Sequence, residues 1–427
     1  MTTLKAVRGT RDLLPPETAL WNRIEATARA VFARYNFGEI RTPVFEDTAL
    51  FSRGVGEETD IVSKEMYTWE DRARAQSEKT QTLTLRPENT AGVVRAYIEH
   101  KLGETGQLQK LYYIGPQFRR ERPQKGRYRQ FSQIGAEVIG PPSAGSESPL
   151  RDAEILEMLA TLLDELGITG WVLEINSVGT SADRARYNET LRAALAPVAA
   201  QMCADCQRRA VTNPLRVLDC KHPEDQHIIE TLPKISDSLD EASIAHFAQV
   251  LAALDASGVP YTRNHRLVRG LDYYTRTTFE FTHDGLGAQN ALLGGGRYDG
   301  LSEAIGGPKA PGIGFAMGED RLVLTLQSLE SAPPQVADAY IAPLGENLNP
   351  AALALARELR RAGLSIDLGD GSFRLKKSFE AADKSARRIV ILGEDELQSG
   401  ILTVKDFSTG IQTKVPRAEL ALALRGD

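Results

Sequence analysis

Apolar residues near the start of the chain recur first at helical and then at alternating spacing. Over residues 21–35 they return every three or four positions, with arginine and glutamate between them, which predicts an amphipathic helix. Gly38 ends that helix, and the alternating residues 39–43 predict a short strand. Because Pro43 has no backbone N–H to donate, we expect this strand at a sheet edge or at an interface.

Strand-like runs surround one helical segment in the next part of the chain. The runs are LTLRP, KLYYIG and YRQFSQIGAEVIG, and the helical segment covers residues 90–100. Together they predict a mostly antiparallel sheet. The Pro-, Ser- and Gly-rich stretch 141–149 predicts a loop, followed by a helix over 152–166 and a strand over 171–176.

Helices with polar joints dominate residues 179–258, where the spacing predicts helices over 183–195 and 241–257. Strand-like runs then resume at Tyr261 and include TTFEF and GIGFAM. Between these two runs GGGRYD, residues 294–299, predicts a loop, and a helix is predicted over 319–326. Because the helical block interrupts one β-rich region, we interpret it as an insertion. The sequence thus predicts an α+β domain made of residues 1–178 and 259–330, with residues 179–258 as a helical insertion domain.

A short proline-marked joint, SAPPQ at 331–335, precedes a further domain. Beyond it the strand-like runs AYIAPL, LSIDL and RIVILG alternate with helical segments 350–362 and 375–386. This alternation is typical of a small α/β domain with a parallel-leaning sheet. We therefore predict a C-terminal α/β domain over residues 335–427.

Composition and charge narrow the class of protein. The 427 residues are 42% hydrophobic and 25% charged, as in globular proteins of two or three domains. No apolar run reaches the length of a membrane span, and the start lacks the apolar stretch of a secretory signal, which favours a cytoplasmic protein without a membrane partner. A formal net charge of -6 argues against non-specific coating of DNA or RNA. Any contact with RNA is therefore expected to be local.

One local basic segment is RRERPQKGRYR at 119–129, which carries six Lys or Arg residues and one Glu. Its plain interpretation is a solvated charged loop. Alternatively, two strands joined by this loop can present guanidinium groups to a triphosphate, since the planar fork of arginine matches phosphate oxygens. Phe131 can then stack on adenine, and Glu121 can accept a hydrogen bond from the exocyclic amine of the base.

Three further segments carry candidate chemistry. In RLVRGLDYYT, residues 266–275, Arg269 can stabilise charge at a reacting phosphorus, or can simply cover an aromatic core. GGGRYD permits close backbone approach to a ligand but lacks the Lys and Ser or Thr of a P-loop. PGIGFAMGEDRL, residues 311–322, places Arg321 and a helix N-terminus near the same anion.

Taken together, these segments resemble the class II aminoacyl-tRNA synthetases. The helix and strand ending at Pro43 are similar to motif 1, FRRERPQKGRYRQF to motif 2 and PGIGFAMGEDRL to motif 3. TLRPENT at 84–90, RLVRGLDYYT and GGGRYDGL are similar to signatures of histidyl-tRNA synthetases, and the resemblance covers nearly the whole chain. It implies ATP-dependent activation of L-histidine to histidyl-adenylate, transfer to the 3′ end of histidine tRNA, Mg²⁺ carried with ATP, and a homodimer built through motif 1.

The resemblance also assigns roles to residues. Arg269 and Arg119 are expected to be catalytic, and Arg122, Gln124 and Lys125 are expected to contact tRNA. Asn89 stands where the family more often has glycine. The residues expected to hold histidine are Glu88, Asn89, Thr90, Arg119, Gln133, Glu137, Arg269, Tyr273 and Tyr274. Those expected to bind ATP are Arg119, Glu121, Arg127, Phe131 and Arg321.

The three cysteines raise the question of a metal. Cys203, Cys206, Cys220 and His222 have the residue types of a zinc site, but CxxC followed by CxH is spaced too tightly for a usual structural knuckle. We therefore expect no tightly bound metal held by the protein. An odd number of cysteines also fits a reducing compartment.

Two other functions remain open on the sequence alone. Class II synthetase folds also occur as non-catalytic, histidine-sensing regulatory subunits of ATP phosphoribosyltransferase, which generally lack the anticodon-binding domain and lose the catalytic arginines. The other alternative is a plain RNA-binding module, which leaves an acid-lined pocket unexplained. Arg119, Arg269 and Arg321 together with the C-terminal domain favour a histidine–tRNA ligase.

Overall fold

The computed structural model describes residues 3–56, 59–71, 80–124, 126–286, 290–329 and 336–425. The chain divides into two compact units, residues 1–332 and 333–427. The predicted joint at 331–335 lies outside the described residues. Within the described ranges, no helix has both the length and the apolar character needed to cross a bilayer.

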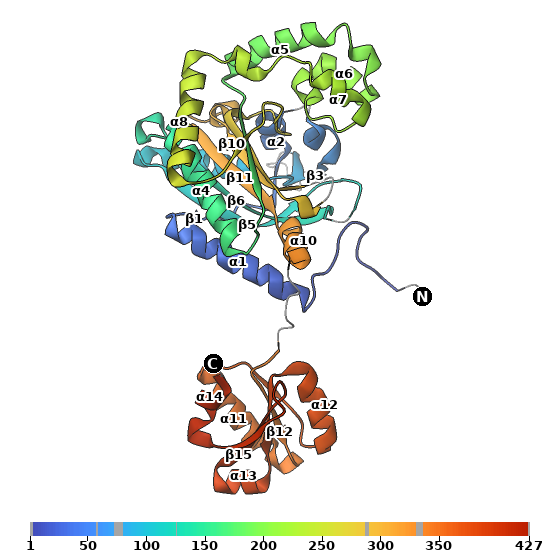
Figure 1. Ribbon diagram of the computed structural model, residues 1–427, viewed down its shortest axis with the longest axis vertical. Helices are drawn as coiled ribbons and strands as arrows, with labels where there is room; N and C mark the ends of the chain where they lie inside the picture. The colour runs from blue at the N-terminus through green and yellow to red at the C-terminus, as the bar shows by residue number, and fades with distance from the viewer. Residues whose placement is uncertain are drawn as a thin grey trace. The chain divides into compact units, whose positions relative to one another are not determined.

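An eight-stranded sheet organises the larger unit (Figure 1), in the order β1-β5-β6-β11-β10-β9-β7-β8. The pairs β1·β5 and β7·β8 at its two edges are parallel, and all the pairs between them are antiparallel. This confirms the mostly antiparallel sheet. The strands are β1 (Gly38–Glu39), β5 (Gln109–Phe118), β6 (Gln130–Ile139), β7 (Val172–Ser177), β8 (Thr262–Arg263), β9 (Thr275–Thr282), β10 (Ala291–Arg297) and β11 (Gly312–Gly318).

The main core lies between this sheet and four helices. These are α1 (Glu17–Arg34), α4 (Pro149–Glu165), α8 (Glu241–Ser257) and α10 (Glu319–Leu329). In α1 the buried positions include Ile24, Ala28 and Val31, which follow the spacing that predicted the helix. Full burial of one such aliphatic side chain contributes about 1.5–3 kcal/mol, so the apolar stripe fixes α1 against the sheet.

The larger unit also contains a second sheet, made of three strands. It has the order β2-β4-β3, with β2 (Phe45–Asp47), β3 (Tyr67–Asp71) and β4 (Gln81–Leu85) all antiparallel. The run LTLRP belongs to β4 and not to the main sheet, because β2 and β3 already pair with both of its edges. α2 (Thr48–Val55) packs beside β2, and α3 (Thr90–Glu99) follows β4.

The inserted residues form a small helical core of their own. α5 (Ser181–Leu195), α6 (Ala204–Thr212) and α7 (Gln226–Ile229) surround buried residues that include Tyr187, Leu191 and Cys206. The following helix, α8, does not join this core. Its Phe247, Val250 and Leu254 pack in the main core instead.

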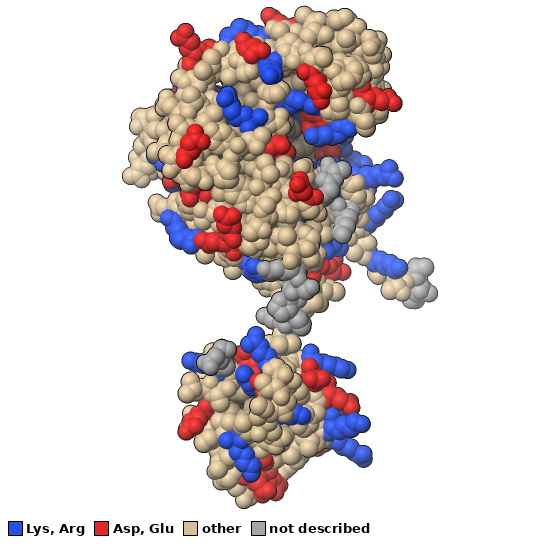
Figure 2. Space-filling view, viewed as in Figure 1, with Lys and Arg blue, Asp and Glu red and all other residues tan. Residues whose placement is uncertain are grey.

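The C-terminal unit contains a five-stranded sheet in the order β13-β12-β14-β15-β16. The first three strands are parallel, as the alternating pattern indicates, while β15 and β16 are antiparallel additions. Basic and acidic side chains are interspersed over its visible face (Figure 2). Its elements are β12 (Ala339–Pro343), α11 (Asn349–Arg361), β13 (Ile366–Leu368), α12 (Leu375–Ser385), β14 (Arg388–Leu392), α13 (Glu394–Ser399), β15 (Ile401–Asp406), β16 (Gln412–Pro416) and α14 (Arg417–Arg425).

The prediction of a loop at 294–299 is wrong for its first four residues, because GGGR forms the end of β10. A Cβ on Gly295 would lie 2.1 Å from the carbonyl oxygen of Gly314, and one on Gly296 would lie 2.6 Å from that of Thr277. The glycines therefore allow neighbouring strands to approach closely. Their run marks tight packing in a central strand.

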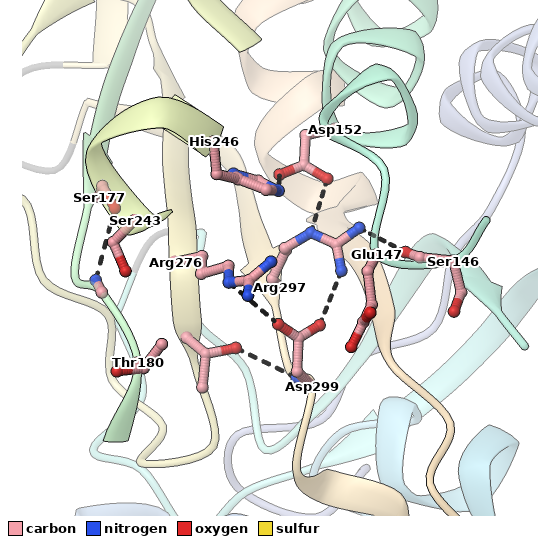
Figure 3. A network of polar contacts seen from close by, with 12 residues as sticks. Ser146, Glu147, Asp152, Ser177, Thr180, Ser243, His246, Arg276, Arg297 and Asp299 are labelled. Atoms are coloured by element: carbon pink, nitrogen blue, oxygen red, sulfur yellow. Dashed lines mark hydrogen bonds and ion pairs between the residues drawn. The ribbon is translucent and has the colours of Figure 1, made fainter. Parts of the chain in front are cut away.

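Arg297 at the end of β10 is fully buried and joins three parts of the chain (Figure 3). Its Nε donates to Asp152 Oδ1 of α4 at 2.8 Å, Nη1 to Asp299 Oδ1 at 2.7 Å, and Nη2 to the Ser146 carbonyl oxygen at 2.5 Å. Burial raises the pKa of Asp152 to about 6 although Arg297 opposes the shift. Burial, together with Arg297, lowers the pKa of the adjacent His246 to about 3, so His246 is neutral at neutral pH.

We predict that Arg297→Met destabilises the larger unit by about 3–5 kcal/mol, because it leaves buried Asp152 without its cation. Urea denaturation followed by tryptophan fluorescence measures this, since all three tryptophans, at 21, 69 and 171, belong to that unit. The control is Lys309→Met, which removes an exposed pair with Glu147 and should leave stability unchanged within error. Equal effects of the two substitutions would show that Arg297 is not a structural tie.

Candidate active site

The main sheet separates the core from a cavity of about 340 Å³. In β6, Ile134, Ala136 and Val138 point into the core, while Phe131 and Gln133 line the cavity. This division follows from the two-residue period of a strand, which turns successive side chains to opposite faces. The cavity therefore occupies the face of the sheet opposite the helical core.

Three arginines from distant segments line this cavity: Arg119, which follows β5, Arg269, and Arg321 of α10. Arg119 Nε donates to the Pro87 carbonyl oxygen at 2.9 Å, and its guanidinium lies 5.2 Å from the centroid of the Phe131 ring. Arg321 Nη1 donates to the Ala291 carbonyl oxygen at 2.6 Å. Each cation is thus held in place while it faces the common space.

Arg269 is partly buried and is paired with a carboxylate. Its Nη1 lies 2.5 Å from Glu280 Oε1 on β9. Burial favours the neutral form, but Glu280 and Tyr274 together outweigh it, and the net effect raises the pKa of Arg269. A Cβ on Gly294 would lie 2.4 Å from Arg269 Nη1. Glycine at this position therefore leaves the space that the guanidinium occupies.

Acidic and polar groups gather at another part of the lining, with Glu88, Thr90, Gln133, Tyr273 and Tyr274. Glu88 accepts from the backbone N–H groups of Thr90 at 2.7 Å and Ala91 at 3.0 Å, at the start of α3. Burial raises the pKa of Glu88 despite these bonds. Gln133 Oε1 is buried and has no hydrogen-bond donor among the described residues, so it is available to a ligand donor.

Glu137 is fully buried behind this wall and is not part of the lining. It accepts from Thr90 Oγ1 at 2.7 Å and from the Tyr298 hydroxyl at 2.7 Å. Burial raises its pKa to about 8. A Cβ on Gly314, which does line the cavity, would lie 1.7 Å from Glu137 Oε2. Gly314 therefore leaves the carboxylate covered by backbone alone.

Asn89 also lies behind the cavity. Its Oδ1 accepts from Thr42 Oγ1 at 2.6 Å and from Arg86 Nη1 at 3.3 Å. Its φ of -117° is an ordinary right-handed value, so a side chain in place of glycine causes no backbone strain here. In this structure Asn89 ties the start of α3 to the segment that precedes β2.

Glu121, Arg127 and Phe131 of the expected nucleotide group line the cavity, and Arg127 Nη1 lies 3.3 Å from Glu121 Oε2. Of the expected tRNA contacts, Arg122 and Gln124 are exposed in the connection between β5 and β6. The backbone of Gln124 pairs with that of Arg127 in both directions, at 3.1 and 2.9 Å. Lys125 lies outside the described residues.

The lining also contains residues to which the sequence interpretation gave no role, among them Tyr128, Glu280, Tyr298 and Asp320. The signal for Glu280 was present in TTFEF, where it alternates with the buried Phe279 and Phe281. Asp320 pairs with Arg11 at 2.8 Å, a contact between residues far apart in sequence that no local pattern indicates.

Comparisons with known proteins agree over almost the full length. A family model described as histidyl-tRNA synthetase matches residues 9–322, and an anticodon binding domain model matches residues 338–426. Relatives named histidine–tRNA ligase are 72% identical in Koribacter versatilis (strain Ellin345), over 99% of this chain and 96% of theirs, and 56% identical in Solibacter usitatus (strain Ellin6076), over 99% of both. The crystal structure of apo S. aureus histidyl-tRNA synthetase is similar with a TM-score of 0.79 and 38% identity, covering 99% of this chain and 100% of that one.

We predict that Glu137→Gln changes how stability depends on pH. Because burial raises the pKa of Glu137 from 4.5 to about 8, the folded chain keeps a proton that the unfolded chain releases above pH 4.5. Its contribution to stability is complete below that pH and is lost as pH rises to about 8. Glutamine cannot ionise, so the variant should gain stability relative to the unmodified chain by up to about 1.4 kcal/mol per pH unit over this window.

Urea denaturation of both proteins at several pH values between about 4.5 and 8 measures this difference. The exposed Glu104→Gln serves as the control and should follow the unmodified protein. Parallel stability curves for Glu137→Gln and the unmodified protein would contradict the predicted protonation of Glu137.

Proposed function

The chain belongs to the histidyl-tRNA synthetase family and catalyses the ligation of histidine to tRNA, and we propose that the reaction takes place in the cavity where Arg119, Arg269 and Arg321 meet. The carboxylate of L-histidine attacks the α-phosphorus of ATP, the bond to pyrophosphate breaks, and histidyl-adenylate forms. A hydroxyl of the 3′-terminal ribose of histidine tRNA then attacks the carbonyl carbon, and AMP leaves. The convergence of three anchored guanidinium groups is the observation that carries this assignment.

Arg269 stabilises the charge that develops at the α-phosphate, while Arg119 and Arg321 hold the phosphate chain. Each cation is already fixed by a carbonyl oxygen or a carboxylate, so little reorganisation is needed when charge develops. Mg²⁺ enters with ATP as part of that substrate. Phe131 and Glu121 contact the adenine ring, which leaves positioning and charge stabilisation as the main sources of catalysis.

Histidine binds among Glu88, Thr90, Gln133, Tyr273 and Tyr274. Glu88 and the unpaired Oε1 of Gln133 accept from the ammonium group. Glu137 lies behind Gly314 and accepts a hydrogen bond from the hydroxyl of Thr90, which it thereby orients toward the histidine, and Asn89 supports the start of α3 from behind. An apolar isostere would leave these buried groups without partners, and the penalty for unpaired groups accounts for specificity.

The connection between β5 and β6 contacts the acceptor end of the tRNA through the exposed Arg122 and Gln124 and through Lys125. The C-terminal unit recognises the anticodon, a role supported by the match to the anticodon binding domain model over residues 338–426.

The enzyme works in the cytoplasm, where ATP and uncharged tRNA meet. A homodimer is supported by three exposed apolar residues on the strand-rich segment after α1, namely Val44, Phe45 and Trp69.

A histidine-sensing regulatory subunit, the main alternative on sequence grounds, does not explain the same features. A sensor of histidine alone needs no cation cluster beside the acidic part of the cavity. The retained anticodon binding domain likewise has no use in a protein that does not contact tRNA.

We predict that Arg269→Ala lowers histidine-dependent exchange of pyrophosphate into ATP by about 10²–10³-fold, as expected when one group that stabilises transition-state charge is removed. Arg417→Ala, which removes an exposed arginine paired with Glu358 in the C-terminal unit, is the control and should leave exchange unchanged. Gly294→Ala provides a second variant, because it keeps Arg269 but fills the space of its guanidinium. Full exchange activity in both cavity variants would rule out the assigned role.

We also predict that removal of residues 336–427 separates the two half-reactions. The larger unit has its own core and the whole cavity, so pyrophosphate exchange should continue. Charging of histidine tRNA at limiting tRNA should fall at least tenfold, because the anticodon contact is lost. Undiminished charging would show that the C-terminal unit does not recognise tRNA.

A further inference from the structure

A cluster of sulfur and oxygen atoms lies in the helical insertion, apart from the cavity. One ligand atom from each of Cys203, Cys206, Cys220 and Asp225 lies within 4.8 Å of the other three. Cys203 is the N-cap of α6 and Cys206 is in its first turn. Cys220 and Asp225 come from the segment before α7, which Figure 1 shows beside α6.

The fourth residue of the cluster is Asp225, whereas the sequence had suggested His222. His222 is exposed, and only its backbone N–H reaches the cluster, donating to Cys220 Sγ at 3.4 Å. Asp225 is fully buried and follows Cys220 by five positions. The tight CxH spacing that argued against zinc is therefore not the spacing of the ligands.

The separations suit a tetrahedral ion. Cys203 Sγ and Cys220 Sγ are 3.9 Å apart, and Cys220 Sγ lies 3.3 Å from Asp225 Oδ2. With Zn–S near 2.3 Å and Zn–O near 2.0–2.2 Å, a regular tetrahedron requires edges of about 3.8 Å between sulfurs and about 3.5 Å between sulfur and oxygen. Small shifts would complete the coordination.

The buried carboxylate of Asp225 has the charge and the position of a metal ligand. Among the described residues, no lysine, arginine or histidine forms an ion pair with Asp225. It accepts hydrogen bonds from the backbone N–H of Cys203 at 3.0 Å and from the thiol of Cys220 at 3.3 Å. Buried charges in proteins are usually paired or coordinate a metal. A divalent cation would pair this carboxylate, and the Cys203 N–H would still orient it as a second contact.

We propose that Cys203, Cys206, Cys220 and Asp225 bind one Zn²⁺. The three thiols release their protons to solvent and bind as thiolates, and one carboxylate oxygen completes the tetrahedron. Soft thiolate ligands favour zinc over Mg²⁺ or Ca²⁺. Four protein ligands leave no open position, so the ion is structural and ties α6 to the segment before α7.

The zinc-tied core also supports a segment of the cavity. Asn213 Nδ2 donates to Asp272 Oδ1 at 3.3 Å, Arg184 Nη1 donates to the Asp272 carbonyl oxygen at 2.9 Å, and Arg216 donates to the Gly270 carbonyl oxygen. These residues border Arg269 and Tyr273. An effect of zinc on exchange activity would rest on the proposed function, whereas zinc binding itself does not.

The test is a titration of the full-length protein, first treated with a chelator and a reductant, with Co²⁺ under anaerobic conditions. We expect about one equivalent to bind, with thiolate-to-cobalt absorption in the near ultraviolet and intense visible bands of a tetrahedral ion, and Zn²⁺ should displace it. Absence of these bands in the unmodified protein would overturn the proposal, whatever the exchange activity.

Matched variants identify the fourth ligand. Asp225→Ala and Cys206→Ser should lower zinc affinity at least tenfold, while His222→Ala should leave it unchanged. Circular dichroism of each variant separates loss of a ligand from loss of the fold, and the result for the unmodified protein stands even if a variant does not fold. An equal loss of affinity in His222→Ala and Asp225→Ala would exclude the proposed ligand set.

Discussion

Strands β6, β9 and β11 turn alternate side chains to opposite faces of one sheet, and the larger unit depends on this two-residue period. On one face, residues such as Ile134, Phe279 and Phe315 pack under the helices. On the other, Gln133 and Glu280 face the cavity. A slip of one residue in any of these strands would exchange core and cavity side chains. The same packing that stabilises the fold therefore places the charged groups.

Glycine provides the space that this arrangement requires. At Gly294 a side chain would collide with the guanidinium of Arg269, and at Gly314 it would collide with the carboxylate of Glu137. Both residues lie in central strands, where glycine normally weakens a sheet. Their cost is offset by the close approach of a cation and a carboxylate to the cavity. The glycine-rich motifs are thus part of the packing as well as of the binding surface.

The sequence predicted the helices whose apolar residues recur with strong periodicity, and it predicted the cavity residues that belong to recognisable motifs. α1 and α8 follow apolar spacing closely, and the three arginines were selected by their motifs. The rest depended on contacts between distant residues. Asp225 was missed as a partner of the cysteines because the exposed His222 stands closer to Cys220 in sequence, and burial cannot be read from spacing. Strand β4 was assigned to the main sheet because composition predicts a strand and not its partners.

Carboxylates of the protein partly neutralise the positive charge of the cavity before any substrate enters. Glu280 pairs with Arg269, and Glu121 lies near Arg119 and Arg127. Burial and the neighbouring Arg127 lower the pKa of Arg321, which has no carboxylate partner among the described residues. A ligand with one negative charge gains little by competing with these pairs. A triphosphate brings several charges to several guanidinium groups at once, so the internal pairing itself favours a polyanionic ligand over a simple anion.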